Sequence, residues 1–407
     1  MRFTVLGAGM MGCATVYDLA QSKDVEEIVV GDYDLKRAKE VAHKFGGDKA
    51  KAVCVDVRKT GGLARYLRGA EAVLNCTQYY WNLAVMKAAL QARVHYLDLG
   101  GLFYTTRNQL KLDKKFKEMG KLAILGIGSA PGIANVMARY LVDQLDRVDF
   151  AGVYNGSRDF QTYPDALSFG FSIATILDEL TIAPVAFTKG RFAKQNHFSG
   201  AEEMTFPEPI GKLVMRHSIH SEVATLPLSF KAKGIQEASF KINYDPQLIE
   251  AVRLLGGMGL LEQKPVWIQG REIAPRAFLE QILKSRPPSG KFPKDVETIR
   301  VVVRGKEGER AQRRSLDATT RYTTNPNFSA VARDTGFPIS VAAQMIARGN
   351  IRVTGVHAPE TAIPPREFLS EMNRRGIRIS GSTWCYLRRK KCAGDKSERD
   401  ADSLPRR

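Results

Sequence analysis

The chain opens with the sequence RFTVLGAGMMG at residues 2–12, and this stretch decides the fold. An apolar run leads directly into Gly7-Ala8-Gly9-Met10-Met11-Gly12, and a helical stretch continues to Leu19. A second apolar run, residues 28–30, then ends on Gly31-Asp32. This order is typical of a dinucleotide-binding βαβ unit: a strand, a Gly-x-Gly-x-x-Gly turn, a helix, a second strand and an acidic residue.

Each residue type in this pattern has a physical role. Gly7 permits the tight turn, Gly9 lets a pyrophosphate approach the backbone, and Gly12 lets helix and strand pack closely. The helix N-terminus offers free N–H groups and partial positive charge to the phosphates. Asp32 can accept hydrogen bonds from both ribose hydroxyls and would repel a 2′-phosphate, which predicts NAD rather than NADP. The basic residues 36–37 keep NADP open as an alternative. They could contact its 2′-phosphate, or they could simply be solvated.

The composition indicates a globular protein with more than one domain. The 407 residues are 44% hydrophobic and 26% charged, and they exceed the size of one typical core. No apolar run reaches the 18 residues of a membrane span, and the chain enters a strand at once, which leaves no room for a secretory signal. The five cysteines are scattered without a C-x-x-C pair. We therefore expect reduced thiols in a cytoplasmic protein, with no metal site.

The net charge of +18 raises the question of nucleic acid, but the charge does not form one patterned arm. The densest cluster, residues 388–391, begins a polar tail, and we predict that residues 388–407 form a basic disordered tail. The positive charge elsewhere in the chain is consistent with the binding of anionic small molecules.

Alternating strand and helix patterns continue after Asp32 and predict an α/β fold with a doubly wound parallel (Rossmann) sheet. Ligands of such sheets lie at the carboxyl ends of the strands, where Asp32, Asp56, Asn75 and Asp98 occur. The expected strands are 2–6, 28–30, 52–55, 72–75, 94–97 and 122–125, and the expected helices are 35–44, 62–67, 82–92, 108–119 and 133–145.

The pattern changes after Val148, where strand-like runs are far apart and mix with polar loops. Residues 150–154, 229–242 and 297–303 predict a second α+β domain with a mainly antiparallel sheet, and helices are expected at 331–346 and 367–375. We assign 1–127 to the dinucleotide-binding domain, 128–327 to the second domain, and 328–387 to the helices that follow it.

Several motifs together resemble the saccharopine dehydrogenase family, and within it the NAD-dependent lysine 6-dehydrogenases. The likeness covers about residues 1 to 380. It rests on the glycine-rich turn and on Tyr96-Leu97-Asp98-Leu99-Gly100-Gly101, Gly128-Ser129-Ala130-Pro131-Gly132, His217, His220-Ser221-Glu222-Val223-Ala224-Thr225-Leu226-Pro227, residues 341–349 and residues 374–377.

The resemblance implies chemistry at a carbon–nitrogen bond. Hydride passes from the amine-bearing carbon to the nicotinamide, and water attacks the resulting imine; a lysine dehydrogenase releases ammonia, and the aldehyde cyclises. Saccharopine-forming relatives run a reductive condensation instead. The resemblance also implies that residues 128–327 are an inserted substrate and dimerisation domain, that homodimers form through its sheet, and that the helices of 328–387 return to the first domain. Two positions depart from the family pattern: Gly126 replaces a common acid, and Tyr33 stands where NADP-using members carry arginine.

Three residues are candidates for catalysis: Asp98, Tyr79 and His217. Asp98 could hold the substrate amine or take its proton, although it could equally cap the turn that follows. Tyr79 could donate to a substrate carboxylate, or it could pack. His217 and the nearby His220 stand out because polar residues surround them, although an isolated histidine is more often structural.

The remaining site predictions follow from the same motifs. Asn82 is also a possible helix N-cap, and Cys76 is also a possible packing residue. We predict that the substrate contacts Gly100, Phe171, Ser221, Glu222 and Thr225, and that the cofactor contacts Gly7, Gly9, Met10, Met11, Gly12, Asp32, Tyr33, Asp56, Val57, Asn75, Cys76, Asn82 and Pro131.

Three functions follow as hypotheses. The first is NAD-dependent oxidative deamination of lysine or a similar amino acid. The second is reductive condensation, as in saccharopine or carboxyspermidine formation, with an amino acid or a polyamine as substrate. The third, of another class, is an NAD-binding regulator with a basic surface for nucleic acid. No helix-turn-helix or aromatic-basic motif accompanies the charge, so nucleic acid is the weakest partner.

Overall fold

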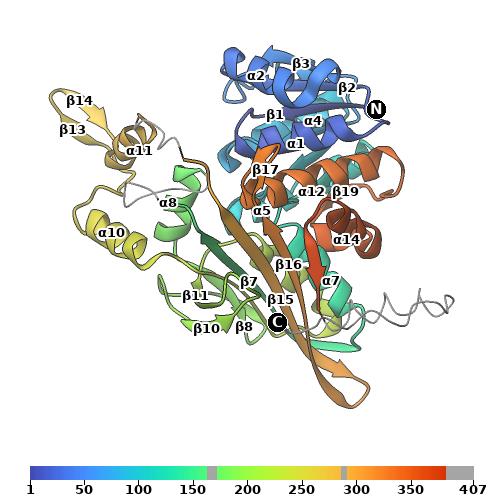
Figure 1. The fold of residues 1–407 in the computed structure, drawn as a ribbon, viewed down its shortest axis with the longest axis vertical. Helices are drawn as coiled ribbons and strands as arrows, with labels where there is room; N and C mark the ends of the chain where they lie inside the picture. The colour runs from blue at the N-terminus through green and yellow to red at the C-terminus, as the bar shows by residue number, and fades with distance from the viewer. Residues whose placement is uncertain (163–171, 286–290, 382–407) are drawn as a thin grey trace, which may run out of the picture.

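The computed structural model describes residues 1–162, 172–285 and 291–381. Its first sheet has seven parallel strands in the order β19-β6-β5-β4-β1-β2-β3 (Figure 1). The order reverses direction between β1 and β4, and this switch point lies beside the glycine-rich turn. The strands are β1 (Arg2–Leu6), β2 (Glu27–Asp32), β3 (Ala50–Cys54), β4 (Ala72–Asn75), β5 (His95–Asp98), β6 (Leu122–Ile124) and β19 (Gly355–His357).

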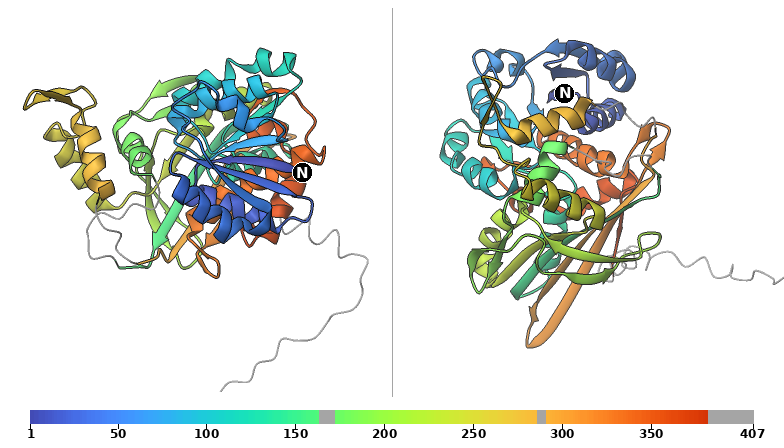
Figure 2. Two further views of the ribbon diagram at one scale, coloured as in Figure 1. Left: turned by 90° about the horizontal axis from the view of Figure 1, so that it is seen from above. Right: turned by 90° about the vertical axis from the view of Figure 1, so that its left-hand side faces the viewer.

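Helices cover both faces of this sheet, as the view from above shows (Figure 2). Apart from the edge strand β3, the strands are mostly buried because apolar side chains point to both faces, which is usual for parallel sheets with helices on either side. The helices are α1 (Met10–Gln21), α2 (Leu35–Val41), α3 (Leu63–Leu67), α4 (Asn82–Ala92), α5 (Leu102–Leu110) and α6 (Asp113–Glu118), with α12 (Ala330–Ala347), α13 (Pro359–Ala362) and α14 (Pro365–Arg374) from the end of the chain.

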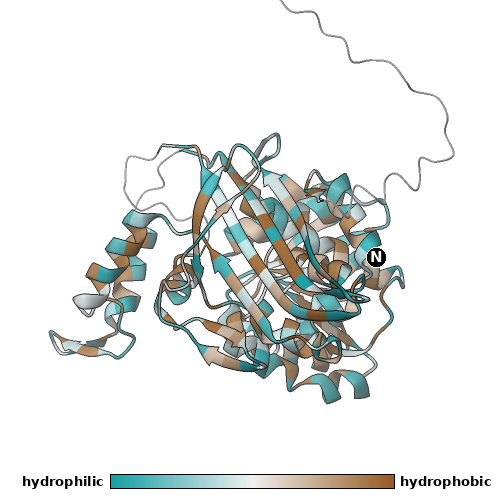
Figure 3. Cartoon of the chain, turned by 90° about the horizontal axis from the view of Figure 1, so that it is seen from below, coloured by the Kyte–Doolittle hydropathy of each residue, from teal (hydrophilic) through white to brown (hydrophobic). Residues whose placement is uncertain are grey.

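The second sheet is mixed and has nine strands, in the order β10-β11-β12-β7-β15-β16-β20, with β8 and β9 attached to β12. Only β12 and β7 pair in parallel. Seen from below, its long strands alternate polar and apolar residues (Figure 3). The strands are β7 (Arg147–Asp159), β8 (Val185–Thr188), β9 (Arg191–Lys194), β10 (Glu202–Thr205), β11 (Lys212–His217), β12 (Glu237–Ile242), β15 (Asp295–Glu307), β16 (Arg310–Arg321) and β20 (Arg378–Ser380).

Helices α7 (Ile133–Val142), α8 (Ile173–Thr181) and α9 (Glu222–Ser229) accompany this sheet. A lobe projects from its side (Figure 1). The lobe consists of α10 (Pro246–Gly257), the hairpin of β13 (Val266–Ile268) and β14 (Arg271–Ile273), and α11 (Pro275–Ser285). Arg276 anchors the lobe, because its guanidinium is almost fully buried against Asp178 of α8 at 2.7 Å.

The end of the chain joins the two sheets. Helix α12 packs along α1 and also contacts β15 and β16. Its first N–H groups are capped by the second domain, because the carboxylate of Asp295 accepts from the backbone of Ala330 at 2.8 Å. The last strand, β20, pairs with β16 of the second sheet. Residues 378–380 therefore do not return to the first domain, to which we assigned them.

The predicted Rossmann sheet with a second α+β domain is confirmed, and local details differ. The helix expected at 108–119 is the end of α5 followed by α6. The strand expected at 229–242 begins only at Glu237, because α9 and a short 3₁₀ turn occupy the residues before it. The seventh parallel strand, β19, was missed. It has only three residues and comes more than 200 residues after β6. The predicted tail at 388–407 lies outside the described residues.

Candidate active site

The glycine-rich turn is shaped to receive a dinucleotide. A Cβ on Gly7 would lie 2.8 Å from the carbonyl oxygen of Cys76, and one on Gly12 would lie 1.9 Å from that of Gly7, so both positions require glycine. At Gly9 the nearest atom would be 3.9 Å away, which leaves open space beside the turn. Helix α1 begins after Gly9 without a side-chain cap, so its first N–H groups remain available to phosphates.

The residues at the end of β2 fit the adenosine part of such a cofactor. Asp32 is 9% exposed, and its Oδ2 accepts a hydrogen bond from the backbone of Ala8 at 2.7 Å. Tyr33 is 67% exposed, and the guanidinium of Arg58 lies over its ring at 5.4 Å. Asp56 forms an ion pair with Arg58 at 2.7 Å, whereas Val57 is buried in the core, away from any ligand. Met10 is 40% exposed at the start of α1.

Asp98 does not face a substrate. It is fully buried, and its Oδ1 accepts from the backbone N–H groups of Gly100 and Gly126 at 2.9 and 2.7 Å. Its Oδ2 accepts from the Tyr96 hydroxyl and the Gln109 amide. Burial raises the pKa of Asp98, while these hydrogen bonds oppose the rise. The carboxylate therefore holds the β5 turn in shape and does not line the interdomain pocket, where a residue that holds the substrate amine or takes its proton would lie.

The side-chain amides of Asn75 and Asn82 are also buried and form hydrogen bonds within the protein. The Asn75 amide donates to Asn82 at 2.9 Å, and the Asn82 amide donates to the carbonyl oxygen of Gly100 at 2.9 Å. Both side chains are 1% exposed, so they support the wall of the site from behind and have no surface left for a cofactor.

A pocket of about 240 Å³ lies between the two domains at the carboxyl ends of the parallel strands. Five residues that we predicted for the site line it: Met11, Cys76, Tyr79, Gly100 and Pro131. Burial raises the pKa of the Cys76 thiol to about 12, so this cysteine is no nucleophile. The second domain and α12 contribute Asn155, Ser172, Thr175, Glu179, His220, Ser221, Glu297 and Thr335.

Two carboxylates and one imidazole give this pocket its charge. Burial raises the pKa values of Glu179 and Glu297 to about 7. The Nδ1 atom of His220 contacts the carboxylate of Glu222, and its ring stacks on Phe240 at 3.8 Å between centroids. Burial alone would lower the pKa of His220, but the charge and hydrogen bond of Glu222 raise it overall. His220 therefore holds a proton more firmly than an exposed histidine.

The hydroxyl of Tyr79 does not point to a free space but donates to Asp178 at 2.6 Å, across the domain boundary. Tyr80 donates to the same oxygen. Burial first, and then the adjacent Asp178, raise the pKa of both tyrosines. Tyr79 thus lines the pocket as a neutral hydrogen-bond donor and links the first domain to Asp178 and to Arg276 of the lobe.

The segment after β11 lies partly on the pocket and partly behind it. Ser221 lines the pocket and accepts a hydrogen bond from the backbone of Gly101 at 3.2 Å. Glu222 and Thr225 are 1% and 4% exposed and stand behind the wall, so they do not contact the cavity directly. Phe171, also predicted to contact the substrate, lies outside the described residues.

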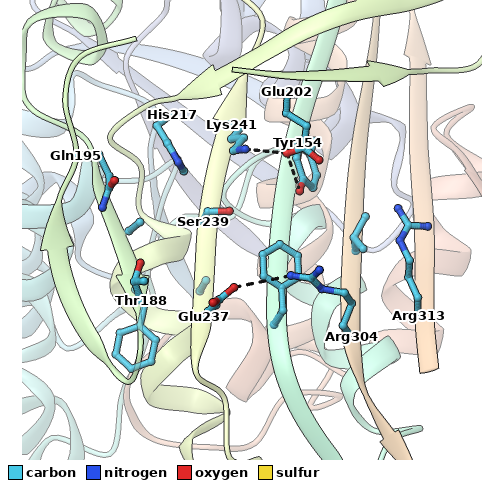
Figure 4. Close-up of a pocket in the computed structure, with 15 residues that line it drawn as sticks. Tyr154, Thr188, Gln195, Glu202, His217, Glu237, Ser239, Lys241, Arg304 and Arg313 are labelled. Carbon is cyan, nitrogen blue, oxygen red and sulfur yellow. Dashed lines mark hydrogen bonds and ion pairs between the residues drawn. The ribbon is translucent and has the colours of Figure 1, made fainter. Parts of the chain in front are cut away.

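His217 belongs to a different pocket. It lies at the end of β11 and lines a hollow of about 340 Å³ on the second sheet with Tyr154, Lys241 and Arg304 (Figure 4). Burial and the nearby Lys241 lower the pKa of His217. His220, three residues further along the chain, lines the interdomain pocket instead. His217, which we predicted at the substrate site, therefore does not line the interdomain pocket, whereas His220 does.

Sequence reasoning missed Glu179 and Glu297. Each lies beside a largely apolar stretch, residues 173–177 for the first and 299–303 for the second, with another acid, Asp178 or Asp295, close to it in the sequence. Acids inside apolar runs are a general sign of a buried functional group, and this sign could have been used.

Family models match both parts of the chain. The model described as the saccharopine dehydrogenase NADP binding domain matches residues 3–124, and the saccharopine dehydrogenase C-terminal domain matches residues 128–377. The chain belongs to the saccharopine dehydrogenase family. It is therefore an oxidoreductase that uses a nicotinamide coenzyme on carbon–nitrogen bonds.

Individual relatives agree with this membership. Carboxyaminopropylagmatine dehydrogenase of Synechocystis sp. is 23% identical over 92% of this chain and 96% of its own length. Carboxynorspermidine synthase of Vibrio cholerae is 24% identical over 93% of this chain and 96% of its own length. The structure of saccharopine dehydrogenase (L-Glu forming) from Saccharomyces cerevisiae matches with a TM-score of 0.70 at 17% identity, over 93% of this chain and 99% of that chain. That likeness shows a common fold.

In the described ranges, none of the helices has the length and apolarity that crossing a bilayer requires.

Proposed function

We propose that this protein joins an amine to a carbonyl compound by reductive condensation and so forms a secondary amine. Two relatives that match over nearly the whole chain carry names of carboxylated polyamines. Breaking carboxynorspermidine at its secondary amine gives 1,3-diaminopropane and an aldehyde that bears an amino-acid carboxylate. We therefore prefer the second of our three hypotheses to lysine deamination.

The charge of the interdomain pocket supports this choice most directly. Glu179 and Glu297 line the pocket, and no lysine or arginine of the described chain does so. A diamine carries only positive charge, which these two carboxylates complement. Neutral donors such as Ser172 and Thr175 supply hydrogen bonds for the carbonyl partner.

The reaction balances in two steps. The neutral amine attacks the carbonyl carbon, and the adduct loses water to give an imine. The bound nicotinamide coenzyme supplies the hydride that reduces the imine carbon, and the nitrogen takes a proton. The overall products are a secondary amine, water and the oxidised coenzyme.

His220 is the residue that we propose for proton transfer. Its Nδ1 is occupied by Glu222, which leaves Nε2 for the substrate. Because Glu222 raises the pKa of His220, the ring can give a proton to the departing hydroxyl group near neutral pH. Stacking on Phe240 fixes the ring plane. Closure of the two domains around the pocket would exclude water while the imine forms.

We propose NAD as the coenzyme in preference to NADP. The carboxylate of Asp32 stands at the end of β2, where a 2′-phosphate would be placed, and Tyr33 follows it in place of a cation. Arg37 lies beside the glycine-rich turn instead, where its Nε donates to the carbonyl oxygen of Ala8 at 2.7 Å.

The test is a coenzyme-oxidation assay with amines and aldehydes supplied together. We expect NADH oxidation only when both are present, and a new secondary amine by mass spectrometry. The variant His220→Gln should lose roughly a hundredfold or more in turnover, which is the usual range for general acid–base catalysis. NAD-dependent oxidation of lysine without a carbonyl partner would instead support deamination.

A further inference from the structure

Glu179 is a nearly buried carboxylate that has no partner. It is 6% exposed, it lines the interdomain pocket, and it makes no hydrogen bond or ion pair with any described residue. Because a buried charge without a partner is costly, proteins keep one chiefly where a ligand completes the site. Burial, and then the neighbouring Glu222, Asp178 and Glu297, raise the pKa of Glu179, while His220 opposes the rise.

Each of the other acids near the pocket has a partner, although Oε1 of Glu222, buried behind the pocket wall, has none among the described residues. Glu297 accepts a hydrogen bond from Ser129 at 2.9 Å. Asp178 accepts from Tyr79 and pairs with Arg276. Glu222 contacts His220. Glu179 is thus the carboxylate on the pocket wall that is left to bind a cation.

The position of Glu179 indicates which part of a substrate it meets. It belongs to α8 of the second domain, whereas the turn for the coenzyme, with Met11 and Cys76, lines the pocket from the first domain. An amine that attacks a carbonyl must be neutral, so the group that remains an ammonium is the one further from the coenzyme.

We propose that Glu179 binds the distal, non-reacting ammonium group of the amine substrate, so that the enzyme selects diamines over monoamines and over lysine. This inference rests on the proposed condensation. It predicts that the selectivity of the enzyme depends on one charge in the protein and one in the substrate.

The experiment varies both charges. The kcat/KM values for 1,3-diaminopropane and n-propylamine are measured with an amino-acid aldehyde and NADH, for the native enzyme and for Glu179→Gln. We expect the native enzyme to prefer the diamine by roughly 10- to 100-fold, the worth of one charge-assisted hydrogen bond. In Glu179→Gln the preference should fall to about threefold or less. An unchanged preference in the variant would overturn the proposal.

Two further measurements complete the test. Glu202→Gln removes one negative charge from the other pocket, where Glu202 pairs with Lys241, and should keep the preference for the diamine. Calorimetric titration of 1,3-diaminopropane into the NAD-loaded protein should show binding that is lost in Glu179→Gln. If this binding occurs but no amine is consumed, the condensation is wrong and the cation site stands. If the diamine does not bind the native protein, the cation site is wrong. Should Glu179→Gln fail to fold, Glu179→Met replaces it.

Discussion

At the scale of single residues, the site separates carboxylates that build the protein from carboxylates that serve a ligand. Asp98 accepts four hydrogen bonds and does not line the pocket, whereas Glu179 lines the pocket and has no hydrogen-bond or ion-pair partner among the residues that the structure describes. Sequence position alone could not distinguish them, because both are acids within apolar surroundings. The difference lies in which donors the fold brings to each oxygen.

Asp98→Asn tests the structural role of this carboxylate. The new amide would place N–H groups against donors such as the backbone of Gly126 or the Gln109 amide. We expect a loss of stability of roughly 1–3 kcal/mol, the usual cost of an unsatisfied buried group, seen as a lower midpoint of thermal unfolding. The pKa values in the pH–rate profile should not change; disappearance of a limb would mean that Asp98 titrates in catalysis.

Glu179 and Glu297, the two glutamates of the pocket, should destabilise the folded protein above neutral pH. Their pKa values are raised to about 7 in the folded state from an ordinary value of 4.5, so the folded state binds more protons than the unfolded state between these values. Stability therefore falls as pH rises through this window. Glu179→Gln should raise the unfolding midpoint at pH 8 and change it little at pH 4.5. An equal shift at both values would contradict the account.

The coenzyme prediction also belongs to single residues. Asp32→Ser combined with Tyr33→Arg removes the repelling charge and adds a cation for a 2′-phosphate. The ratio of NADH to NADPH affinities should change by roughly ten- to a hundredfold in favour of NADPH, measured by fluorescence titration. Equal affinities in the native protein would show that Asp32 does not discriminate.

At the scale of elements, the turn after β6 has a shape that requires glycine at position 126. Gly126 has a φ of +73°, and a Cβ there would lie 2.5 Å from Cγ of Pro131. We expect Gly126→Asp to lower the unfolding midpoint by several degrees and to weaken substrate binding, because Pro131 lines the pocket. A variant of native stability and activity would show that the turn can adjust.

Much of the first domain could be predicted from the sequence because its signals are local. Alternation of apolar runs and helical patterns, with glycines at the first turn, specifies each βα unit within about 30 residues. The short strand β19 lacked such a signal, since its pairing with β6 depends on the whole intervening domain. In the same way, Glu179 and Glu297 come from elements more than 100 residues apart, so their convergence on one pocket could not be read from either segment.

At the scale of the whole molecule, the two domains meet through polar contacts that surround the pocket. Tyr79 and Tyr80 reach Asp178 of α8, and Ser221 reaches the backbone of Gly101. These contacts should loosen when the domains open. We expect Tyr79→Phe with Tyr80→Phe to raise KM more than it lowers kcat, because the chemistry uses neither hydroxyl. A loss in kcat alone would assign a tyrosine to the proton transfer.

The dimer that the family resemblance implies stays a prediction. We expect a mass in solution of twice the 45.2 kDa of one chain, measured by light scattering. The outer hollow of the second sheet (Figure 4) contains Arg304 directly opposite Arg313 on neighbouring strands. If that face forms the interface, Arg304→Glu should give monomers; if dimers persist, a different surface forms the interface.

The central claim is that this enzyme condenses an amine with a carbonyl compound, and one measurement tests it most directly. The native protein is incubated with NADH, 1,3-diaminopropane and an amino-acid aldehyde, and the masses of the products are measured by mass spectrometry. The account predicts a secondary amine whose mass is that of both substrates, less one water and plus two hydrogens, formed together with NAD. Coenzyme turnover with lysine alone, and no such adduct with the diamine and aldehyde, would contradict it.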